Sequence, residues 1–284
     1  MLKTTPLHQY IEDLHRKFEN VNAGELADYI PELTKANPDW FGIVLVTVDG
    51  HVYQYGDVRQ KFTIQSTSKP LVYGMALEDH GLDYVMNKVN VEPSGEAFNR
   101  ISLEYHTGRP RNAMINAGAI ATASIIKGDN EQHKFERILD KFSLIAGEKL
   151  DVDMDVYRSE KATGSRNRAL AHLLYSGGII EGEPEDSLDR YFKQCSILVN
   201  CRQLALMGAT LSNQGVNPVT GTRAFQEKYL PKMTSVMTSC GMYDGSGAWI
   251  YDIGMAAKSG VGGGIMAVLP GRFGLAIFSP RLDE

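Results

Sequence analysis

Hydrophobic residues at the amino end of the chain recur with the spacing of a helix. Leu7, Ile11, Leu14 and Phe18 follow one another at intervals of three or four positions, with polar residues between them. This spacing places the four side chains on one face of a helix. We therefore predict an amphipathic helix over residues 6–18.

Two segments near opposite ends of the chain each predict a β-hairpin. The β-branched run 41–48 is followed by Asp49-Gly50 and then by the alternating run 51–55. Asp-Gly between two such runs is typical of a tight hairpin turn. The glycine-rich run 260–269 and the run 273–278 flank a second turn at residues 270–272.

Between the hairpins the pattern changes to helices that are rich in Ala, Leu and Met and interrupted by Gly. We therefore expect an α+β fold in which both chain ends build one antiparallel sheet. The sheet would occupy a lobe formed by about residues 1–70 and 225–284, and about residues 71–224 would form a helical lobe. No repeat or linker divides the chain, so we predict a single catalytic domain over 1–284.

Composition changes this picture little but excludes several classes of partner. The chain has 284 residues, of which 43% are hydrophobic and 22% charged, which is ordinary for a globular protein. Its net charge of −5 and the absence of a long basic block argue against nucleic acid as a partner. No apolar run has the length to span a membrane, and the first residues do not have the pattern of a secretion signal. We therefore expect a cytoplasmic protein.

The cysteines support the same compartment. Cys195, Cys201 and Cys240 form a sparse and odd-numbered set, which does not suit a disulfide framework. We expect them to be buried or partly buried thiols in a reducing environment.

The most informative polar pattern is Ser66-Thr-Ser-Lys69, at the expected start of a helix. Positions three apart share one helical face, so the amine can take the proton of the hydroxyl and turn the serine into a nucleophile. The positive end of the helix dipole disfavours the ammonium form of Lys69. Pro70 fits only a first helical turn. Ser124 and Lys127 repeat the spacing at the end of a predicted helix, and we interpret that copy as structural.

A second signal is Lys258-Ser259-Gly260, which we place at the opening of the glycine-rich strand. Penicillin-recognising enzymes pair an S-x-x-K helix with a K-[ST]-G strand. The glycines let the strand backbone come close to a ligand, and the Lys258 cation would help to lower the pKa of Lys69. Tyr243, shortly before this motif, is either a proton relay, once nearby cations lower its pKa, or an ordinary core or rim tyrosine.

Other motifs that carry chemistry are missing or incomplete. Residues 151–155 resemble the first half of a calcium loop, but Val156 and Ala162 replace the glycine and glutamate that the loop requires. The histidines have no metal-ligand spacing, and neither a nucleotide-binding glycine motif nor G-x-S-x-G is present. We therefore expect neither a metal nor a cofactor.

Together the motifs resemble those of the serine-dependent glutaminases, a family shared by bacteria and animal mitochondria. The resemblance extends from about residue 29 to residue 280. It rests on the following stretches: Gln65-Ser66-x-Ser68-Lys69-Pro70, Glu92-Pro-Ser-Gly95 with Phe98-Asn99, 115–120, 159–160 with 163–164 and 166–167, 215–218, 240–244 and 257–264. The chain departs from the family pattern at Ala113 and Ala256, where proline is expected.

The resemblance implies a fold similar to that of β-lactamases and penicillin-binding proteins. It implies hydrolysis of L-glutamine to L-glutamate and ammonia through a covalent glutamyl-serine intermediate. Carried over by motif, Ser66 is the nucleophile, Lys69 its base, and Tyr243 a proton carrier, an alternative base or both. The backbone amides of Ser66 and Val261 would form the oxyanion hole.

The resemblance also implies which residues surround the substrate. These are Tyr29, Gln65, Asn116, Glu160, Asn167, Tyr191, Tyr243 and Val261. A carboxylate such as Glu160 suits the free α-ammonium, and neutral amide and hydroxyl donors suit the α-carboxylate. The family further implies a homodimer or homotetramer.

Two other functions share some of these features. A penicillin-recognising hydrolase, either a β-lactamase or a D,D-peptidase, would use the same two lysine motifs but would work outside the cytoplasm. A non-catalytic binding protein of the same fold would not need Ser66, Lys69 and Tyr243 together.

Overall fold

The computed structural model describes residues 5–96 and 100–282. Its centre is a five-stranded antiparallel sheet with the order β2-β1-β7-β6-β5. The strands are β1 (Gly42–Thr47), β2 (Val52–Gly56), β5 (Ala256–Ser259), β6 (Gly264–Leu269) and β7 (Phe273–Phe278). The prediction that both chain ends build one antiparallel sheet is therefore confirmed.

The two predicted hairpins meet where β1 pairs with β7, with Leu45 opposite Leu275. The glycine-rich segment differs from the prediction. Lys258 and Ser259 end β5 instead of opening β6, and residues 260–263 form the turn between these strands. The turn is closed by a hydrogen bond of 3.0 Å from the Gly263 amide to the Gly260 carbonyl. Consecutive glycines permit this tight turn, whose Gly263 has φ of 91°.

Helices occupy most of the remaining chain. The predicted amino-terminal helix is confirmed as α1 (Pro6–Phe18). The others are α2 (Lys69–His80), α3 (Leu82–Lys88), α4 (Asn116–Ser124), α5 (Glu131–Ala146), α6 (Met154–Thr163), α7 (Ser165–Ser176), α8 (Pro184–Cys195), α9 (Cys201–Ser212), α10 (Leu230–Cys240) and α11 (Ser246–Asp252). Short 3₁₀ turns are η1 (Pro31–Lys35), η2 (Gln65–Ser68), η3 (Glu227–Tyr229) and η4 (Tyr243–Gly245), and β3 (Lys61–Thr63) pairs with β4 (Leu198–Asn200).

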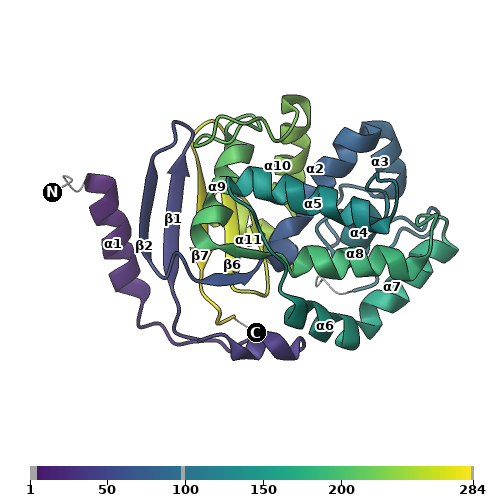
Figure 1. Cartoon of the computed structure of the whole chain (residues 1–284), viewed down its shortest axis with the longest axis horizontal. Coiled ribbons are helices and arrows are strands. Elements are labelled where there is room, and N and C mark those ends of the chain that lie inside the picture. Colours follow the sequence, from purple (N-terminus) through teal and green to yellow (C-terminus); the bar gives the residue numbers. More distant parts are fainter. Residues whose placement is uncertain (1–4, 97–99, 283–284) are drawn as a thin grey trace.

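The sheet has a helix on each face (Figure 1). Helix α9 packs on β7, β6 and β1, whereas α1 lies against β2 on the opposite side. Close approach of α9 requires small residues, because a Cβ at Gly274 would lie 2.0 Å from the backbone nitrogen of Ala209. Helix α9 falls within the predicted helical lobe; it packs mainly on the sheet and also contacts α5. The boundaries of the two lobes stay a prediction.

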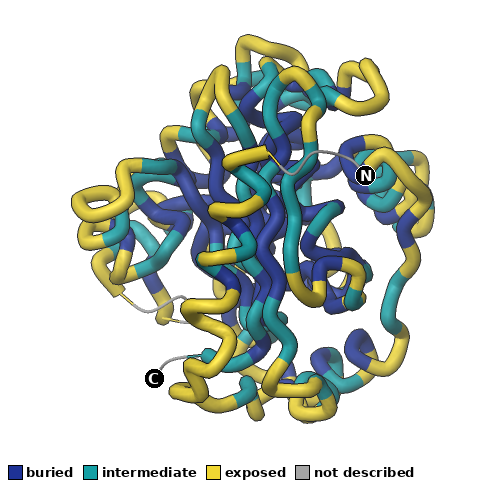
Figure 2. Tube along the Cα trace, turned by 90° about the vertical axis from the view of Figure 1, so that its left-hand side faces the viewer, coloured by how far each residue is buried: buried dark blue, intermediate teal, exposed yellow. Residues whose placement is uncertain are grey.

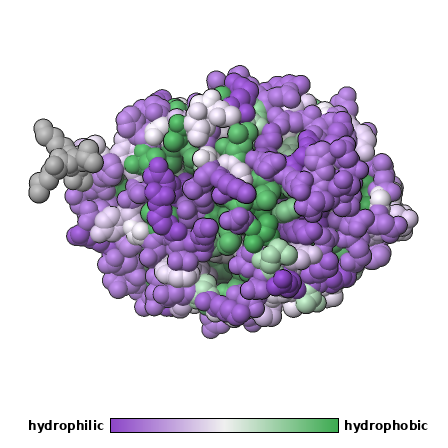
Figure 3. Space-filling view, in the orientation of Figure 1, coloured by the Kyte–Doolittle hydropathy of each residue, from purple (hydrophilic) through white to green (hydrophobic). Residues whose placement is uncertain are grey.

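Buried residues fill the middle of the molecule, and exposed residues form its outer turns (Figure 2). One hydrophobic cluster joins the sheet to α2, α5, α9 and α10, and a second one joins α4, α7 and α8. The surface in view is mostly hydrophilic, with some hydrophobic residues toward its middle (Figure 3). No helix in the described ranges is long and apolar enough to cross a membrane. The three cysteines are buried free thiols, as predicted.

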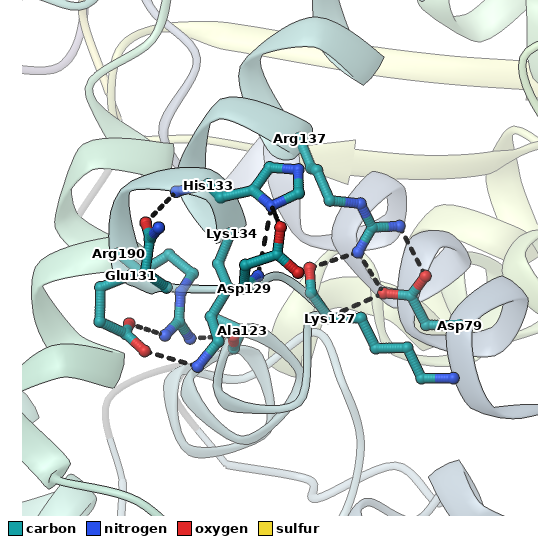
Figure 4. A network of polar contacts seen from close by, with 10 residues as sticks. Asp79, Ala123, Lys127, Asp129, Glu131, His133, Lys134, Arg137 and Arg190 are labelled. Carbon is teal, nitrogen blue, oxygen red and sulfur yellow. Dashed lines mark hydrogen bonds and ion pairs between the residues drawn. The ribbon is translucent and has the colours of Figure 1, made fainter.

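Charged residues fix the carboxyl end of α4 (Figure 4). The buried Arg190 of α8 donates to the carbonyl of Ala123 and pairs with Glu131. Nearby, Arg137 of α5 pairs with Asp79 of α2 at 2.7 Å. Positive side chains at the end of a helix satisfy carbonyls that lack a partner within the helix. These contacts anchor the carboxyl end of α4, the helix whose first residue is Asn116.

Candidate active site

Ser66 lies in the 3₁₀ turn η2, directly after β3, and Lys69 is the first residue of α2. The predicted helix start is thus correct for Lys69, while Ser66 belongs to the tighter turn before it. Both residues are buried, and Lys69 is 0% exposed. Gln65, the residue before the serine, has a left-handed backbone with φ of 48°. Such a conformation is uncommon for a non-glycine residue and often occurs in functional sites.

Tyr243 reaches this turn from η4, and its hydroxyl shares a hydrogen bond with that of Ser66. Two lysine amines flank the tyrosine ring. The Nζ of Lys258 lies 3.8 Å from the ring centroid, and the Nζ of Lys69 lies 5.8 Å from it. Like Gln65, Tyr243 has a left-handed backbone, with φ of 56°. The structure therefore places the predicted serine, lysine and tyrosine around one point.

The amine of Lys69 has different partners from those that the sequence suggested. It donates to the carbonyl of Met114 at 3.2 Å and to Oδ1 of Asn116 at 2.7 Å. Within residues 5–96 and 100–282, it makes no hydrogen bond to Ser66 Oγ. The direct contact of the serine hydroxyl is with Tyr243 instead. The amine is thus anchored at the amino end of α4, where it remains close to the tyrosine ring.

Burial is the main cause of the unusual acidities in this site. It lowers the pKa of Lys69 to about 8, against the opposing charges of Cys195 and Glu160. Burial lowers the pKa of Lys258 well below its ordinary range, and repulsion by Lys69 lowers it further. Burial raises the pKa of Tyr243, although the hydrogen bond with Ser66 opposes the change. The expectation that nearby cations lower the pKa of this tyrosine was therefore wrong.

A cavity of about 280 Å³ is connected to these residues through Asn116, which lines it and accepts from Lys69, whereas Ser66, Lys69 and Tyr243 are not among its lining residues. Four of the predicted substrate residues line it, namely Tyr29, Asn116, Glu160 and Asn167. Glu160 is buried, and its Oε2 has no hydrogen-bond partner in the described part of the chain. Burial raises the pKa of Glu160 to about 8, against the effects of Lys69 and Gln65. A buried carboxylate oxygen without a partner is well suited to a cationic ligand group.

Amide and hydroxyl groups connect the cavity wall to the reactive residues. Asn116 donates to Oδ1 of Asn167 at 3.0 Å, and its own Oδ1 accepts from the hydroxyl of Tyr191 at 3.3 Å. Gln65 donates to the Thr63 hydroxyl at 3.3 Å, and its side chain lies near enough to Glu160 to oppose the rise in the pKa of that carboxyl group. Asn116, Asn167, Tyr191 and Lys69 thus form one hydrogen-bonded system, and within the described ranges no hydrogen bond links Gln65 or Glu160 to it.

The turn 260–263 lies against the backbone that carries the serine. A Cβ at Gly262 would lie 2.4 Å from the carbonyl oxygen of Thr63, and a Cβ at Gly260 would lie 3.3 Å from the Ser66 nitrogen. Glycine is required here because any side chain would separate the two backbones. Val261, between these glycines, lines an adjacent cavity of about 190 Å³ rather than the larger one beside Glu160.

Comparison with known proteins identifies the family. The family profile described as glutaminase matches residues 24–284. This chain belongs to the glutaminase family. It is 54% identical to a glutaminase of Trichormus variabilis over 282 residues, which cover 99% of this chain and 84% of that protein.

Solved structures of glutaminases agree with this assignment. A probable glutaminase superimposes with a TM-score of 0.95 at 42% identity, covering 98% of this chain and 90% of that chain. A probable glutaminase from Bacillus subtilis, complexed with 6-diazo-5-oxo-L-norleucine, has a TM-score of 0.87 at 34% identity and covers 100% of this chain and 90% of that chain.

Several residues at the site of this glutaminase were absent from the predicted set. They are the carbonyl of Met114, Arg166 at the cavity, and Gln194 and Cys195 on α8. The last two follow Tyr191 by three and four positions, so helical spacing from a predicted site residue was a usable signal. The predicted motif residues Phe98 and Asn99 lie outside the described residues. No group of three or more potential metal ligands occurs in the ranges described.

Proposed function

We propose that this glutaminase hydrolyses the side-chain amide of L-glutamine to L-glutamate and ammonia through a glutamyl ester on Ser66. One observation carries the proposal. The Ser66 hydroxyl is hydrogen-bonded to Tyr243, whose ring has buried amines of Lys258 and Lys69 at 3.8 and 5.8 Å. A serine hydroxyl becomes a useful nucleophile only when a base can accept its proton, and this cluster supplies candidate bases.

The cavity suits a free amino acid with an uncharged side-chain amide. In our proposal the α-ammonium group binds the vacant oxygen of Glu160. The α-carboxylate accepts hydrogen bonds from neutral donors such as Asn116, Asn167 and Tyr29. Burial raises the pKa of Tyr191 well above its ordinary value, which keeps its hydroxyl protonated and able to donate.

The reaction needs two nucleophilic attacks on the same carbon. Ser66 Oγ attacks the side-chain amide carbon while its proton passes to Lys69, with Tyr243 as proton carrier, alternative base or both. The carbon–nitrogen bond then breaks, and the proton is delivered to the departing nitrogen, which leaves as ammonia. Water attacks the ester, gives its proton to the same base, and releases glutamate and a restored Ser66.

Each attack generates a negatively charged oxygen on the substrate. We propose that the backbone amides of Ser66 and Val261 donate to this oxygen. The close approach of the Gly260–Gly262 turn to the Ser66 backbone supports this assignment. Two preorganised donors typically contribute a few kcal/mol each to the stabilisation of such an oxyanion.

The test is a coupled assay with glutamine, asparagine and a fluorescent penicillin. We expect glutamate and ammonia from glutamine, no covalent labelling by the penicillin, and no turnover by Ser66→Ala, which should still fold. Ammonia release by Ser66→Ala would remove Ser66 as the nucleophile. Labelling by the penicillin would instead favour the penicillin-recognising alternative, which no feature of the site supports over glutaminase activity.

We also propose a β-lactamase-like fold, a homodimer or homotetramer, and a cytoplasmic location. The antiparallel sheet with Lys69 at the start of α2 supports the fold proposal. Sedimentation equilibrium tests the oligomer, and a monomer at micromolar concentration would contradict it. Cell fractionation tests the location.

A further inference from the structure

The backbone conformation of Gln65 sets the direction of the chain at Ser66, the proposed nucleophile. Its φ of 48° turns the chain so that the next residue, Ser66, faces Tyr243. Its side chain donates to the Thr63 hydroxyl at 3.3 Å and lies near Glu160, in the cavity wall. A left-handed glutamine is an unfavourable conformation that persists only when surrounding contacts hold it in place.

Two buried hydrogen bonds in series connect the Gln65 carbonyl to helix α8. The hydroxyl of Ser68 donates to the carbonyl of Gln65 at 2.6 Å. The Ser68 hydroxyl in turn accepts from the side-chain amide of Gln194 at 2.9 Å. Ser68 and Gln194 are both 0% exposed. Helix α8 therefore reaches the strained residue through one intermediate hydroxyl.

Stability alone does not explain why a glutamine occupies position 194. Its Oε1 is buried without a hydrogen-bond partner in the described part of the chain. An amide that uses only one of its two polar groups in a buried site destabilises the fold compared with an apolar side chain of similar size. The same helix face carries Tyr191, three residues earlier, which is hydrogen-bonded to Asn116. One face of α8 therefore contacts both the cavity wall and the support of the nucleophile turn.

We propose that Gln194 is a positioning residue that fixes the geometry of Ser66 through Ser68 and the Gln65 carbonyl. The proposal rests on the proposed role of Ser66 as nucleophile. Gln194 is not among the residues that line the cavity, and its amide donates to Ser68, so its proposed effect is on the orientation of the Ser66 hydroxyl and amide. Small displacements of reacting groups reduce the rate of the chemical step more than they reduce substrate binding.

The test is a double-mutant cycle in kcat with Gln194→Met, Ser68→Ala and the double variant. Met keeps the volume of glutamine but cannot donate to Ser68. We expect each single variant to lower kcat about tenfold, with KM changed less than about threefold. Because both residues act through one chain, the double variant should lose about as much as one single variant.

The matched control is Gln203→Met. Gln203 is also a buried helical glutamine, but it completes the capping box of α9 with Asn200. We expect this variant to melt at a lower temperature and to keep its kcat. If Gln194→Met does not fold, Ser68→Ala alone carries the test, because it removes a single oxygen atom.

The outcomes separate this proposal from the proposed function. Unchanged kcat in Gln194→Met or in Ser68→Ala, while Ser66→Ala is inactive, would overturn the positioning role but leave the nucleophile assignment intact. Losses that multiply in the double variant, to about a hundredfold, would also overturn it. Activity retained by Ser66→Ala would overturn the nucleophile assignment itself.

Discussion

Tyr243 and Ser66 come from distant parts of the chain, and their side-chain hydroxyls share a hydrogen bond. Both lie in 3₁₀ turns, η4 and η2, and each turn contains one left-handed non-glycine residue, Tyr243 itself and Gln65. Two residues with unfavourable backbone conformations therefore lie at or next to the contact between Ser66 and Tyr243. This places the tyrosine, rather than Lys69, next to the serine oxygen.

Replacing Lys69 tests whether the serine and the lysine act as one unit. We expect Lys69→Ala to be nearly inactive, because the site loses the amine that, in our proposal, accepts the serine proton. The double variant Ser66→Ala/Lys69→Ala should be no slower than the worse single variant, since residues of one catalytic unit are not additive. Steady-state ammonia release measures all three. A further large loss in the double variant would show that the two residues act independently.

Glu160→Gln should raise the KM for glutamine steeply, because the α-ammonium group loses its paired carboxylate. Loss of a buried charge partner typically costs about 2–5 kcal/mol of binding. The kcat should fall less than kcat/KM does, since the ammonium lies away from the reacting carbon. Initial rates over a wide range of glutamine concentration provide the measurement. A KM equal to that of the unchanged enzyme would place Glu160 outside the substrate site.

The same substitution should change the pH dependence of stability. The pKa of Glu160 is raised from 4.5 to about 8 in the folded state, so folded molecules hold a proton that unfolded molecules release between those pH values. The contribution of this group to stability therefore falls as pH rises from 4.5 to 8. Glu160→Gln should accordingly gain several degrees in Tm at pH 8 and little at pH 5. The exposed Glu148→Gln is the control, and an equal gain at both pH values would contradict the assignment.

The pH profile of kcat/KM reports the free enzyme, in which Lys69 and Glu160 both have a pKa of about 8. Activity in our proposal needs a neutral Lys69 and a charged Glu160, so both must lose a proton. The value of kcat/KM should therefore rise from pH 6 to about pH 9, by more than tenfold per pH unit at the acid end. A profile that falls over this range would contradict the roles of both groups.

Lys258→Met should leave the acid limb of the kcat profile in place. Repulsion by Lys69 lowers the pKa of Lys258, so Lys258 is the first of the two amines to become neutral. Burial is the main cause of the lowered pKa of Lys69, and no effect of Lys258 contributes to it. Single-turnover rates between pH 6 and 10 test this expectation. A limb that moves to higher pH would show that a charged Lys258 helps to lower the pKa of Lys69.

Gly262→Ala should lower kcat strongly, because the new methyl group would lie 2.4 Å from the Thr63 carbonyl and push the turn away from Ser66. We expect a loss of about a hundredfold, comparable to removal of one oxyanion donor. Gly182→Ala is the matched control, since no atom lies within 4 Å of the position that its methyl group would take, and its φ is not in the left-handed region. Equal activity of the two variants would show that the position of the 260–263 turn does not contribute to the proposed oxyanion hole.

Local sequence patterns were sufficient for much of the scaffold. The apolar run 273–278, the Asp49-Gly50 turn and the spacing of Leu7 to Phe18 each depend on neighbours within a few positions, and the structure has these elements there. The Gly260–Gly264 segment was misplaced because glycines serve a strand bulge and a tight turn equally well. Only the structure, in which this segment lies close to the Ser66 backbone, shows that the glycines form a tight turn rather than a strand bulge.

The sequence by itself determined the residue types of the site and the order of its motifs, including the spacing of Ser66 and Lys69. Only the tertiary structure decided which partner each of them has: Tyr243 for the serine, Asn116 and the Met114 carbonyl for the lysine, and Gln194 for the turn between them. The physical reason is that periodicity fixes which face of a helix is buried, whereas the packing of α2, α8 and β5 around η2 fixes what that face meets.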